Sequence, residues 1–197
     1  MENKHYFDKL YQESKDLLWK GFIHKKQLKY LLEELKQGKV LDLGAGEGAD
    51  AIFLAKKGFK VKAADISETA INRIKEIAKK EKVSLEAETA DLETYQIKEN
   101  YDAIISFATI HFLKKEQIDK IIKEIKEHTN KGGINIIMVF REGDETQGDF
   151  DMYYFKDGEL KQYYTGWEIL SYREYEKLDT AHGKPHTHKI ATIIAKK

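Results

Sequence analysis

Apolar residues recur along this chain with two alternating spacings. Short apolar runs, typical of buried strands, are separated by stretches in which leucine or isoleucine returns every third or fourth position, which is typical of amphipathic helices. The short runs predict strands at residues 39–43, 61–64, 83–88, 101–107 and 134–140. The longer stretches predict helices over residues 8–37, 49–57, 68–80 and 115–129.

Small and polar residues mark where these elements end. Gly38 is expected to cap the first helix at its C-terminus, and Gly58 is expected to stop the second helix. Ser67 precedes the third helix and is expected to cap its N-terminus. The segment at 130–133, Asn-Lys-Gly-Gly, is expected to form a turn that closes the fourth helix.

Strands and helices therefore alternate with short links, and this alternation predicts a parallel sheet with helices on both faces. Beyond residue 141 the pattern changes. Residues 169–175 and 189–195 are expected to be strands joined by a histidine-rich turn at 182–188. Two strands joined in this way are expected to be antiparallel and to form the far edge of the sheet. The predicted class is α/β, with a Rossmann-like parallel sheet and an antiparallel C-terminal edge.

Composition and charge limit the functions that this fold can serve. The length favours a single domain over residues 1–197. Basic and acidic residues number 34 each, which argues against a nucleic-acid partner, and the absence of cysteine excludes disulfide and thiolate chemistry. No apolar run is long enough to cross a membrane, and the first five residues are too charged for a signal peptide. We therefore expect a cytoplasmic monomer or homodimer that acts on a small molecule, not on nucleic acid or a membrane.

Three glycines mark a candidate ligand site. Gly44, Gly46 and Gly48 follow the first predicted strand and open a helix, so a ligand can approach the backbone and the positive end of that helix. Asp65 ends the second strand, 19 residues after Gly46, where an acid can accept both hydroxyls of an adenosine ribose. The glycine spacing also loosely fits the dinucleotide-binding pattern, so it does not identify the ligand by itself.

The charged residues around the glycines distinguish between two kinds of adenosine ligand. Residues 41–55 contain no lysine or arginine, but they contain Asp42, Glu47 and Asp50. A pyrophosphate group would meet three acids and no cation there, whereas S-adenosylmethionine carries a positive sulfonium and a positive ammonium. The acid-rich segment therefore favours S-adenosylmethionine.

A third acid completes the pattern. Asp91 follows the third predicted strand, where its carboxylate can accept from the exocyclic amine of adenine and the backbone of Leu92 can complete the base edge. The glycine loop, Asp65 and Asp91 all follow predicted strands. Open parallel sheets bind ligands at this carboxyl edge.

In order along the chain, these features resemble the motifs of class I S-adenosylmethionine-dependent methyltransferases. The matching segments are Val40–Gly48, Asp65, Asp91 and Tyr101–Phe107. The resemblance implies S-adenosyl-L-methionine as cofactor and S-adenosyl-L-homocysteine as product. By position, Gly44 and Gly46 would contact the methionine moiety, and the Ser106–Phe107 backbone would accept from its ammonium. The cofactor residues that the resemblance implies are Asp42, Gly44, Gly46, Asp65, Ile66, Asp91, Leu92, Ser106 and Phe107.

The C-terminal part is similar to the tellurite-resistance methyltransferases. The similarity lies in Phe155–Leu160, Tyr163–Glu168 and Ile190–Lys197. That family is associated with methylation of tellurite, selenite and related oxyanions, and the resemblance implies such acceptors. One difference is the turn at 181–188, which carries histidines where the family places arginines.

The histidines of this turn have several possible roles. His182, His186 and His188 could bind an oxyanion when protonated, ligate a metal, or belong to a plain surface turn. If residues 186–190 are extended, His186 and His188 point to the same side. We assign the three histidines to substrate contact and assign no metal.

Two further residues are expected at the substrate. His111 follows the fourth strand and is expected to be catalytic, as a general base or a polar substrate contact, or else to cap the next helix. Arg141 ends the fifth strand and is expected to meet an anionic acceptor, with a surface ion pair as the alternative. One group of aromatic side chains is expected to be core, with a lid over the methyl group as the alternative. These are Phe150, Tyr153, Tyr154, Phe155, Tyr163, Tyr164 and Trp167.

Together these features divide the domain into a helical cover (1–38), a cofactor-binding core (39–141) and a substrate-side part (142–197). We expect methyl transfer to a small acceptor such as a tellurite-type or selenite-type oxyanion. The alternatives are an organic thiol, amine or phenol as acceptor, and a sensor that binds the cofactor without turnover.

Overall fold

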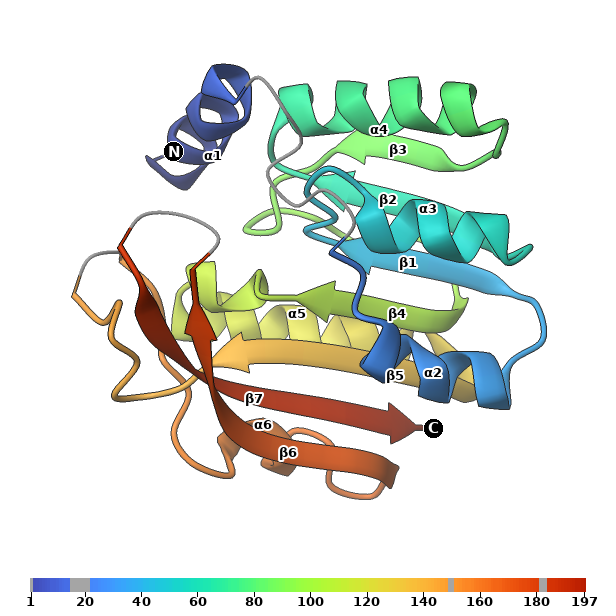
Figure 1. The fold of residues 1–197 in the computed structure, drawn as a ribbon. Helices are drawn as coiled ribbons and strands as arrows, with labels where there is room; N and C mark the ends of the chain where they lie inside the picture. Colours follow the sequence, from blue (N-terminus) through green and yellow to red (C-terminus); the bar gives the residue numbers. More distant parts are fainter. Residues whose placement is uncertain (1, 15–21, 149–150, 181–183) are drawn as a thin grey trace.

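A computed structural model describes residues 2–14, 22–148, 151–180 and 184–197. In these residues a seven-stranded sheet has the strand order β3-β2-β1-β4-β5-β7-β6 (Figure 1). The strands are β1 (Lys39–Leu43), β2 (Lys60–Asp65), β3 (Glu86–Thr89), β4 (Tyr101–Phe107), β5 (Thr129–Phe140), β6 (Glu168–Asp179) and β7 (His186–Lys196). The first five strands are mutually parallel, whereas β7 pairs antiparallel with both β5 and β6. The predicted α/β class and its antiparallel edge are confirmed.

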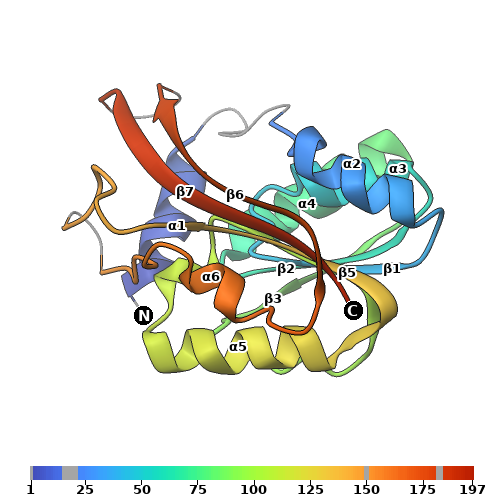
Figure 2. The same ribbon diagram turned by 90° about the horizontal axis from the view of Figure 1, so that it is seen from below.

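Helices cover both faces of the sheet (Figure 2). One face carries α2 (Lys25–Glu34), α3 (Ala49–Lys56) and α4 (Glu68–Glu81), and the other carries α5 (Lys115–Glu127) and the short α6 (Glu159–Gln162). A 3-10 turn, η1 (Ile110–Phe112), follows β4, and α1 (Glu2–Glu13) lies beside the start of α4. In the described part of the chain, none of the helices has both the length and the apolar composition that crossing a bilayer requires.

The spacing of apolar residues explains how each helix binds the sheet. In α5 the buried isoleucines are Ile118, Ile121, Ile122 and Ile125, which share one helical face. Leu28 and Leu31 of α2 are fully buried against the opposite sheet face, together with Ile71 and Ile74 of α4. The sheet is packed between these two apolar cores, so its strand ends remain for building a site.

The predicted helix over residues 8–37 is wrong in extent. The structure has α1 ending at Glu13 and α2 beginning at Lys25, with residues 22–24 outside either helix. Gly38 is also not a helix cap, because α2 ends at Glu34 and its C-cap residue is Leu35, which is extended. A Cβ added to Gly38 would lie 2.5 Å from Asp102 Oδ2. Glycine is therefore needed at this position for the close approach of a side chain on β4.

The predicted turn at 130–133 lies inside a strand. β5 begins at Thr129, which pairs with Tyr101, and the ladder resumes with Ile134 opposite Ala103. The intervening residues form an irregularity in the ladder, which explains why their glycines look like a turn in the sequence. The third strand likewise begins at Glu86, later than the predicted start at residue 83.

The predicted turn at 182–188 is shorter than expected. β6 extends to Asp179 and β7 begins at His186, so His186 and His188 belong to a strand. His182 lies outside the described residues. Strand geometry confirms that His186 and His188 share one side, because their rings meet with centroids 4.6 Å apart.

The aromatic residues between β5 and β6 belong mainly to the core. Phe155 and Tyr164 are fully buried on the α5 face, and Tyr153, Tyr163 and Trp167 contact the same core. Tyr154 is also buried, and its hydroxyl donates to the Thr146 carbonyl over 2.8 Å. Phe150 lies outside the described residues. The core interpretation of this segment is confirmed for the aromatic residues that the structure describes.

Candidate active site

The carboxyl ends of the five parallel strands meet at one edge of the sheet, on the left in Figure 1. At that edge, α1, the end of β6 and the start of β7 lie near the loops that follow β1, β2 and β4. β1 lies between β2 and β4, so the chain leaves this strand on one side and later returns on the other. Open α/β sheets bind their ligands at such a switch point.

The glycine loop requires glycine for two separate reasons. Gly44, Gly46 and Gly48 have φ angles of +74°, +52° and +77°, a region that side chains other than glycine rarely adopt. Gly44 is also crowded, because an added Cβ would lie 2.1 Å from the Thr109 side chain. Thr109 Oγ1 donates to the Phe107 carbonyl over 3.0 Å and is 3.3 Å from the Gly44 carbonyl. The loop after β1 is thus joined to the loop after β4.

Asp65 holds this loop from the end of β2. Its carboxylate accepts from the Gly46 N–H over 2.7 Å and from the Ser67 N–H over 2.9 Å. Ser67 in turn caps α4, as predicted, by accepting from the Ala70 N–H over 3.2 Å. Burial raises the pKa of Asp65 despite these hydrogen bonds. Asp65 therefore organises the loop at the position predicted for ribose contact.

Asp42 is a buried acid whose surroundings disfavour its negative charge. It is 3% exposed, and burial raises its pKa well above the ordinary value, with Asp50 and Asp65 adding to the effect. A positive group near this carboxylate would remove that penalty.

Two carboxylates of the acid-rich segment have partners that the sequence of the segment does not reveal. The carboxylate of Glu47 lies 2.5 Å from Arg73 Nη1, which comes from α4. Asp50 accepts from the His24 backbone N–H over 2.8 Å and lies 2.6 Å from His24 Nδ1. The expectation that these acids have no cation is therefore wrong for Glu47, because its partner lies far away in the sequence.

His24 itself was not among the predicted site residues. Its ring stacks on Phe107 with centroids 3.9 Å apart and an interplanar angle of 8°. This contact connects the segment before α2 to the end of β4. The available sequence signal was Asp50, an acid on the buried side of a short helix, although nothing in the sequence pairs it with His24.

The α1 helix contacts the glycine loop directly. A Cβ added to Gly46 would lie 3.0 Å from the Tyr11 hydroxyl, and Tyr11 is 5% exposed. Arg73 Nη2 donates to the backbone carbonyls of Tyr11 and Ser14 over 2.6 and 2.7 Å. Asp8 accepts from the Ser67 hydroxyl over 2.6 Å. The start of the predicted helical cover thus lies over the glycine loop, whereas α2 belongs to the core.

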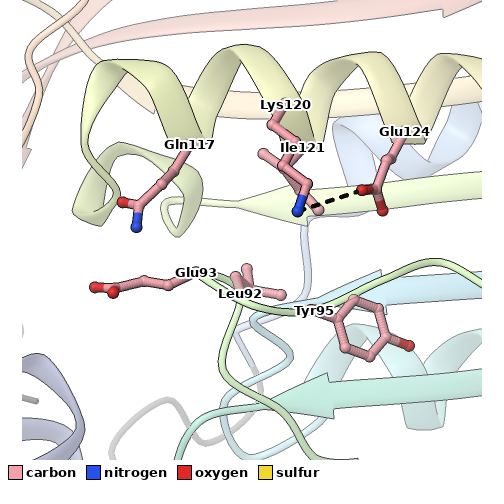
Figure 3. A pocket seen from close by; sticks show the side chains of 7 residues that line it. All are labelled: Leu92, Glu93, Tyr95, Gln117, Lys120, Ile121 and Glu124. Carbon is pink, nitrogen blue, oxygen red and sulfur yellow. Dashed lines mark ion pairs between the residues drawn. The ribbon is translucent and has the colours of Figure 1, made fainter.

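The predicted adenine contacts lie at the turn after β3. Asp91 is exposed and accepts from the Glu93 N–H over 3.0 Å. The Leu92 side chain is 9% exposed and, with Glu93, lines a shallow solvent-open groove beside α5 (Figure 3). Ile66 is half-buried after β2. Since the Leu92 side chain is taken up by packing, its backbone is what remains for a ligand.

The two predicted residues at the end of β4 are fixed by the fold. Ser106 is fully buried, and its hydroxyl donates to the Leu43 carbonyl over 2.9 Å. The Phe107 ring stacks on His24, and the Phe107 carbonyl accepts a hydrogen bond from the Thr109 hydroxyl. These contacts join β4 to β1 next to the glycine loop. The structure thus brings Asp42, Gly44, Gly46, Asp65, Ser106 and Phe107 to neighbouring strand ends.

His111 is fully buried in η1 and does not cap α5, whose N-cap is Lys114. Its Nδ1 accepts from the Phe140 N–H over 3.4 Å, so a neutral ring carries its proton on Nε2. Among the described residues, Nε2 has no hydrogen-bond partner. Burial lowers the pKa of His111 to about 3. The ring is therefore neutral, with an uncommitted donor.

His188 belongs to a second polar group on the same edge. Its ring stacks on Phe140 with centroids 4.1 Å apart, and His111 stacks on Phe140 with centroids 4.4 Å apart. His188 Nδ1 lies 3.1 Å from Asp144 Oδ2. Burial would raise the pKa of Asp144, but hydrogen bonds from His188, Thr146 and the Lys189 backbone outweigh it and lower this pKa to about 2. Asp144 was not predicted, because a polar loop gives no sign of burial.

Arg141 is neither at the surface nor open to a ligand in this structure. It is 9% exposed, forms an ion pair with Asp157, and lies 3.4 Å from Glu174. Its Nε donates to the Ile190 carbonyl over 3.4 Å. These contacts join the end of β5 to the hairpin, and the ion pair with Asp157 connects a buried guanidinium to an exposed carboxylate. Contact with an anionic acceptor would require Arg141 to leave these partners.

Structural comparison defines the class of protein. The chain matches the crystal structure of TehB from Haemophilus influenzae with a TM-score of 0.80 and 32% identity, covering 98% of this chain and 66% of that one. It also matches the structure described as "Conversion of a Disulfide Bond into a Thioacetal Group during Echinomycin Biosynthesis", a likeness of fold alone. That match has a TM-score of 0.75 and 20% identity and covers 98% and 91% of the two chains. The fold is that of the class I methyltransferases.

Sequence comparison narrows the class to one family. Residues 1–191 match the family described as "Tellurite resistance protein TehB", and the chain belongs to it. A curated relative is the probable S-adenosyl-L-methionine-dependent methyltransferase TehB of Haemophilus influenzae (strain ATCC 51907 / DSM 11121 / KW20 / Rd). The two are 37% identical over 164 residues, which cover 81% of this chain and 57% of the relative. The chain thus spans little more than half the length of that relative.

Proposed function

We propose that this protein transfers a methyl group from S-adenosyl-L-methionine to a small acceptor, with S-adenosyl-L-homocysteine as the second product. The observation that carries the proposal is Asp42, which is buried beside the glycine loop and whose pKa is raised by burial and by the neighbouring acids Asp50 and Asp65. A cationic ligand suits this position better than an anionic one. Family membership and the methyltransferase named among the relatives support the same reaction.

The residues at this edge fit the cofactor group by group. Asp65 uses its carboxylate for two backbone N–H groups, and its remaining lone pairs can accept the two ribose hydroxyls. The Phe107 carbonyl accepts from Thr109 and has a second lone pair for the ammonium. Gly44 and Gly46 leave the backbone open to the methionine moiety, and the Leu92 backbone can complete the adenine edge.

The cofactor supplies an activated methyl group on sulfur, and the protein's contribution is alignment and exclusion of water. Holding two reactants in line lowers the barrier by up to roughly 7–11 kcal/mol. A neutral His111 whose Nδ1 already accepts a hydrogen bond carries a buried Nε2–H that has no hydrogen-bond partner among the described residues. We therefore assign His111 to donating a hydrogen bond to an anionic acceptor and not to removing a proton.

The acceptor that we propose is an oxyanion of the tellurite or selenite type. Such a soft nucleophile needs no strong base, which agrees with a histidine whose pKa is about 3. A hydrogen-bond donor at His111 would hold one of its oxygens. Organic thiols, amines and phenols are the next acceptors, and an amine or phenol would require a base elsewhere. We place the reaction in the cytoplasm.

The test is an acceptor assay on the purified chain. S-adenosyl-L-methionine is supplied with tellurite or selenite, release of S-adenosyl-L-homocysteine is followed, and the solution is analysed by mass spectrometry for the methylated oxyanion. We expect product in both measurements. Cofactor binding without product on either oxyanion would refute the acceptor and direct the assay to organic acceptors. Absence of turnover on all of them would leave a sensor.

Variants of one residue sharpen the assay. His111→Ala is expected to lower turnover and to change the dissociation constant of the cofactor by less than about threefold. His128→Ala, at the opposite end of β5, serves as the matched control. A large loss of cofactor affinity in His111→Ala alone would contradict the substrate role of this histidine.

A further inference from the structure

Three potential metal ligands meet on the β6–β7 hairpin. Asp179 is the ladder partner of His186, and His188 lies two residues further along the same face. One ligand atom from each side chain lies within 4.8 Å of the others. The group lies at the same sheet edge as His111, with the ring of Phe140 between the two histidines.

The hydrogen bonds determine where the protons of the two imidazoles lie. His186 Nδ1 is 2.8 Å from the Lys184 carbonyl, and His188 Nδ1 is 3.1 Å from Asp144 Oδ2. Carbonyl and carboxylate oxygens only accept, so both Nδ1 atoms must be the donors. Each neutral ring then has a lone pair on Nε2.

These two lone pairs face each other. His186 Nε2 and His188 Nε2 are 3.1 Å apart. With both Nδ1 protons committed, two neutral rings at this distance repel. The contact is favourable only when a positive species lies between the nitrogens, and that species is either a proton or a metal ion.

The surroundings favour a metal ion over a proton. Two nitrogens bound to a tetrahedral zinc ion at about 2.0–2.1 Å lie roughly 3.3 Å apart, close to the observed spacing. A carboxylate oxygen of Asp179 lies 3.8 Å from His188 Nε2 and provides a third ligand. The nitrogen spacing and the convergence of all three ligand atoms together match a metal site.

Asp144 accepts a hydrogen bond from the second ring nitrogen of His188. Metal-bound histidines typically donate their second N–H to a carboxylate, which fixes the ring orientation and strengthens the ligand. Asp144 does this for His188, and it is itself held by the Thr146 hydroxyl and the Lys189 N–H over 2.6 and 2.8 Å. His188 is only 8% exposed, so its orientation is set by the core.

We propose that His186 Nε2, His188 Nε2 and the Asp179 carboxylate bind a divalent transition-metal ion. Zinc suits this set best, because two imidazoles and one carboxylate form a common open zinc site. Such a site leaves a coordination position for water or an anion. This inference is independent of the proposed methyl transfer, since it rests on the hairpin alone.

The test is calorimetric titration of the full chain with zinc sulfate after dialysis against a chelator. We expect one zinc ion per chain and a loss of at least tenfold in affinity in His186→Ala and in Asp179→Asn. His128→Ala, a histidine at the opposite end of β5, is the matched control and should bind zinc as the unchanged chain does. His188→Ala is less suitable because His188 is buried.

Thermal unfolding gives a second measurement that does not depend on activity. Zinc should raise the Tm of the unchanged chain and of His128→Ala, but should leave the Tm of His186→Ala nearly unchanged. The proposal is overturned if the unchanged chain shows no saturable zinc binding. It is equally overturned if His186→Ala and Asp179→Asn bind zinc as tightly as the control, because the zinc would then lie elsewhere.

Discussion

Two polar groups occupy the same edge of the sheet and are built by different means. The glycine side comprises Asp42, the glycine loop and Asp65, and it is held by backbone N–H groups within a short stretch of chain. The histidine side comprises His111, Phe140, Asp144 and His188, and it is held by ring stacking and by side chains from distant strands. One side presents carboxylates and open backbone, whereas the other presents imidazoles.

This difference matches the division of labour that we propose. A site of carboxylates and bare backbone suits a ligand with positive groups and ribose hydroxyls. A site of neutral or metal-binding imidazoles suits an anion. The two sides can therefore be separated experimentally, since a change on one side should alter one ligand and spare the other.

The largest effect is expected on the glycine side, at Gly44. In Gly44→Ala the new methyl would overlap the Thr109 side chain, and alanine would have to adopt a φ of +74°. We therefore expect the free energy of unfolding to fall by about 2–4 kcal/mol. We also expect the variant to lose cofactor binding. Denaturant unfolding and calorimetry measure the two. Gly58→Ala is the control, because its φ is +92° but no atom lies within 4 Å of the added Cβ. Equal losses in both variants would contradict the crowding argument.

The next effect concerns acid stability on the histidine side. His111 has a pKa of about 3 when folded and about 6.5 when unfolded, so the unfolded chain takes up a proton first as the pH falls. Stability is thus retained above pH 6.5 and lost progressively toward pH 3, by about 1–2 kcal/mol at pH 5. His111→Phe should lose less stability between pH 7 and pH 5, as measured by urea unfolding at each pH. If the unchanged chain and the variant lose the same amount, His111 is not buried as a neutral ring.

Two neighbouring acids on the glycine side should respond with opposite signs. Asp42→Asn removes a carboxylate whose pKa is raised by burial and by other acids, so we expect a gain of about 1 kcal/mol in unfolding free energy at pH 8. Asp65→Asn replaces an acceptor of two N–H groups by a side chain with only one acceptor, so we expect a loss of about 1–2 kcal/mol. Both should weaken cofactor binding. A loss of stability in Asp42→Asn would show that its charge is already compensated.

The smallest global effect is expected where α1 meets the glycine loop. Arg73→Ala removes the donors to Tyr11 and Ser14 and the partner of Glu47. We expect faster amide exchange in α1 and cofactor affinity several-fold weaker, with less than about 1 kcal/mol lost in global unfolding. Lys75→Ala, an exposed residue of the same helix, is the control. Unchanged exchange in α1 would refute the anchoring role of Arg73.

Much of the fold and of the glycine side could be predicted because the signals are local. The strands at 39–43 and 101–107 have the predicted bounds, and Ser67 caps α4 as expected. Each of these features depends on residues within a few positions of one another, where spacing and side-chain type determine the conformation.

The histidine side could not be assembled in this way. His111, Asp144 and His188 meet only after β7 has paired with β5, and no local pattern encodes that register. The partners of Arg141 and Glu47 are equally distant in the sequence. β7 also begins at His186, earlier than predicted, so His186 and His188 lie in a strand where alternate residues share a face.

The position of β7 has a consequence for how the chain acquires its shape. β6 precedes β7 in the sequence, yet its ladder partner in the sheet is β7, which lies between β6 and β5. During synthesis β6 must therefore wait without a neighbour until β7 has left the ribosome. The parallel half and the α5 face can collapse earlier, and the hairpin docks last. A nascent chain stalled within β7 would expose the edge of β5, the point at which aggregation on the ribosome would begin.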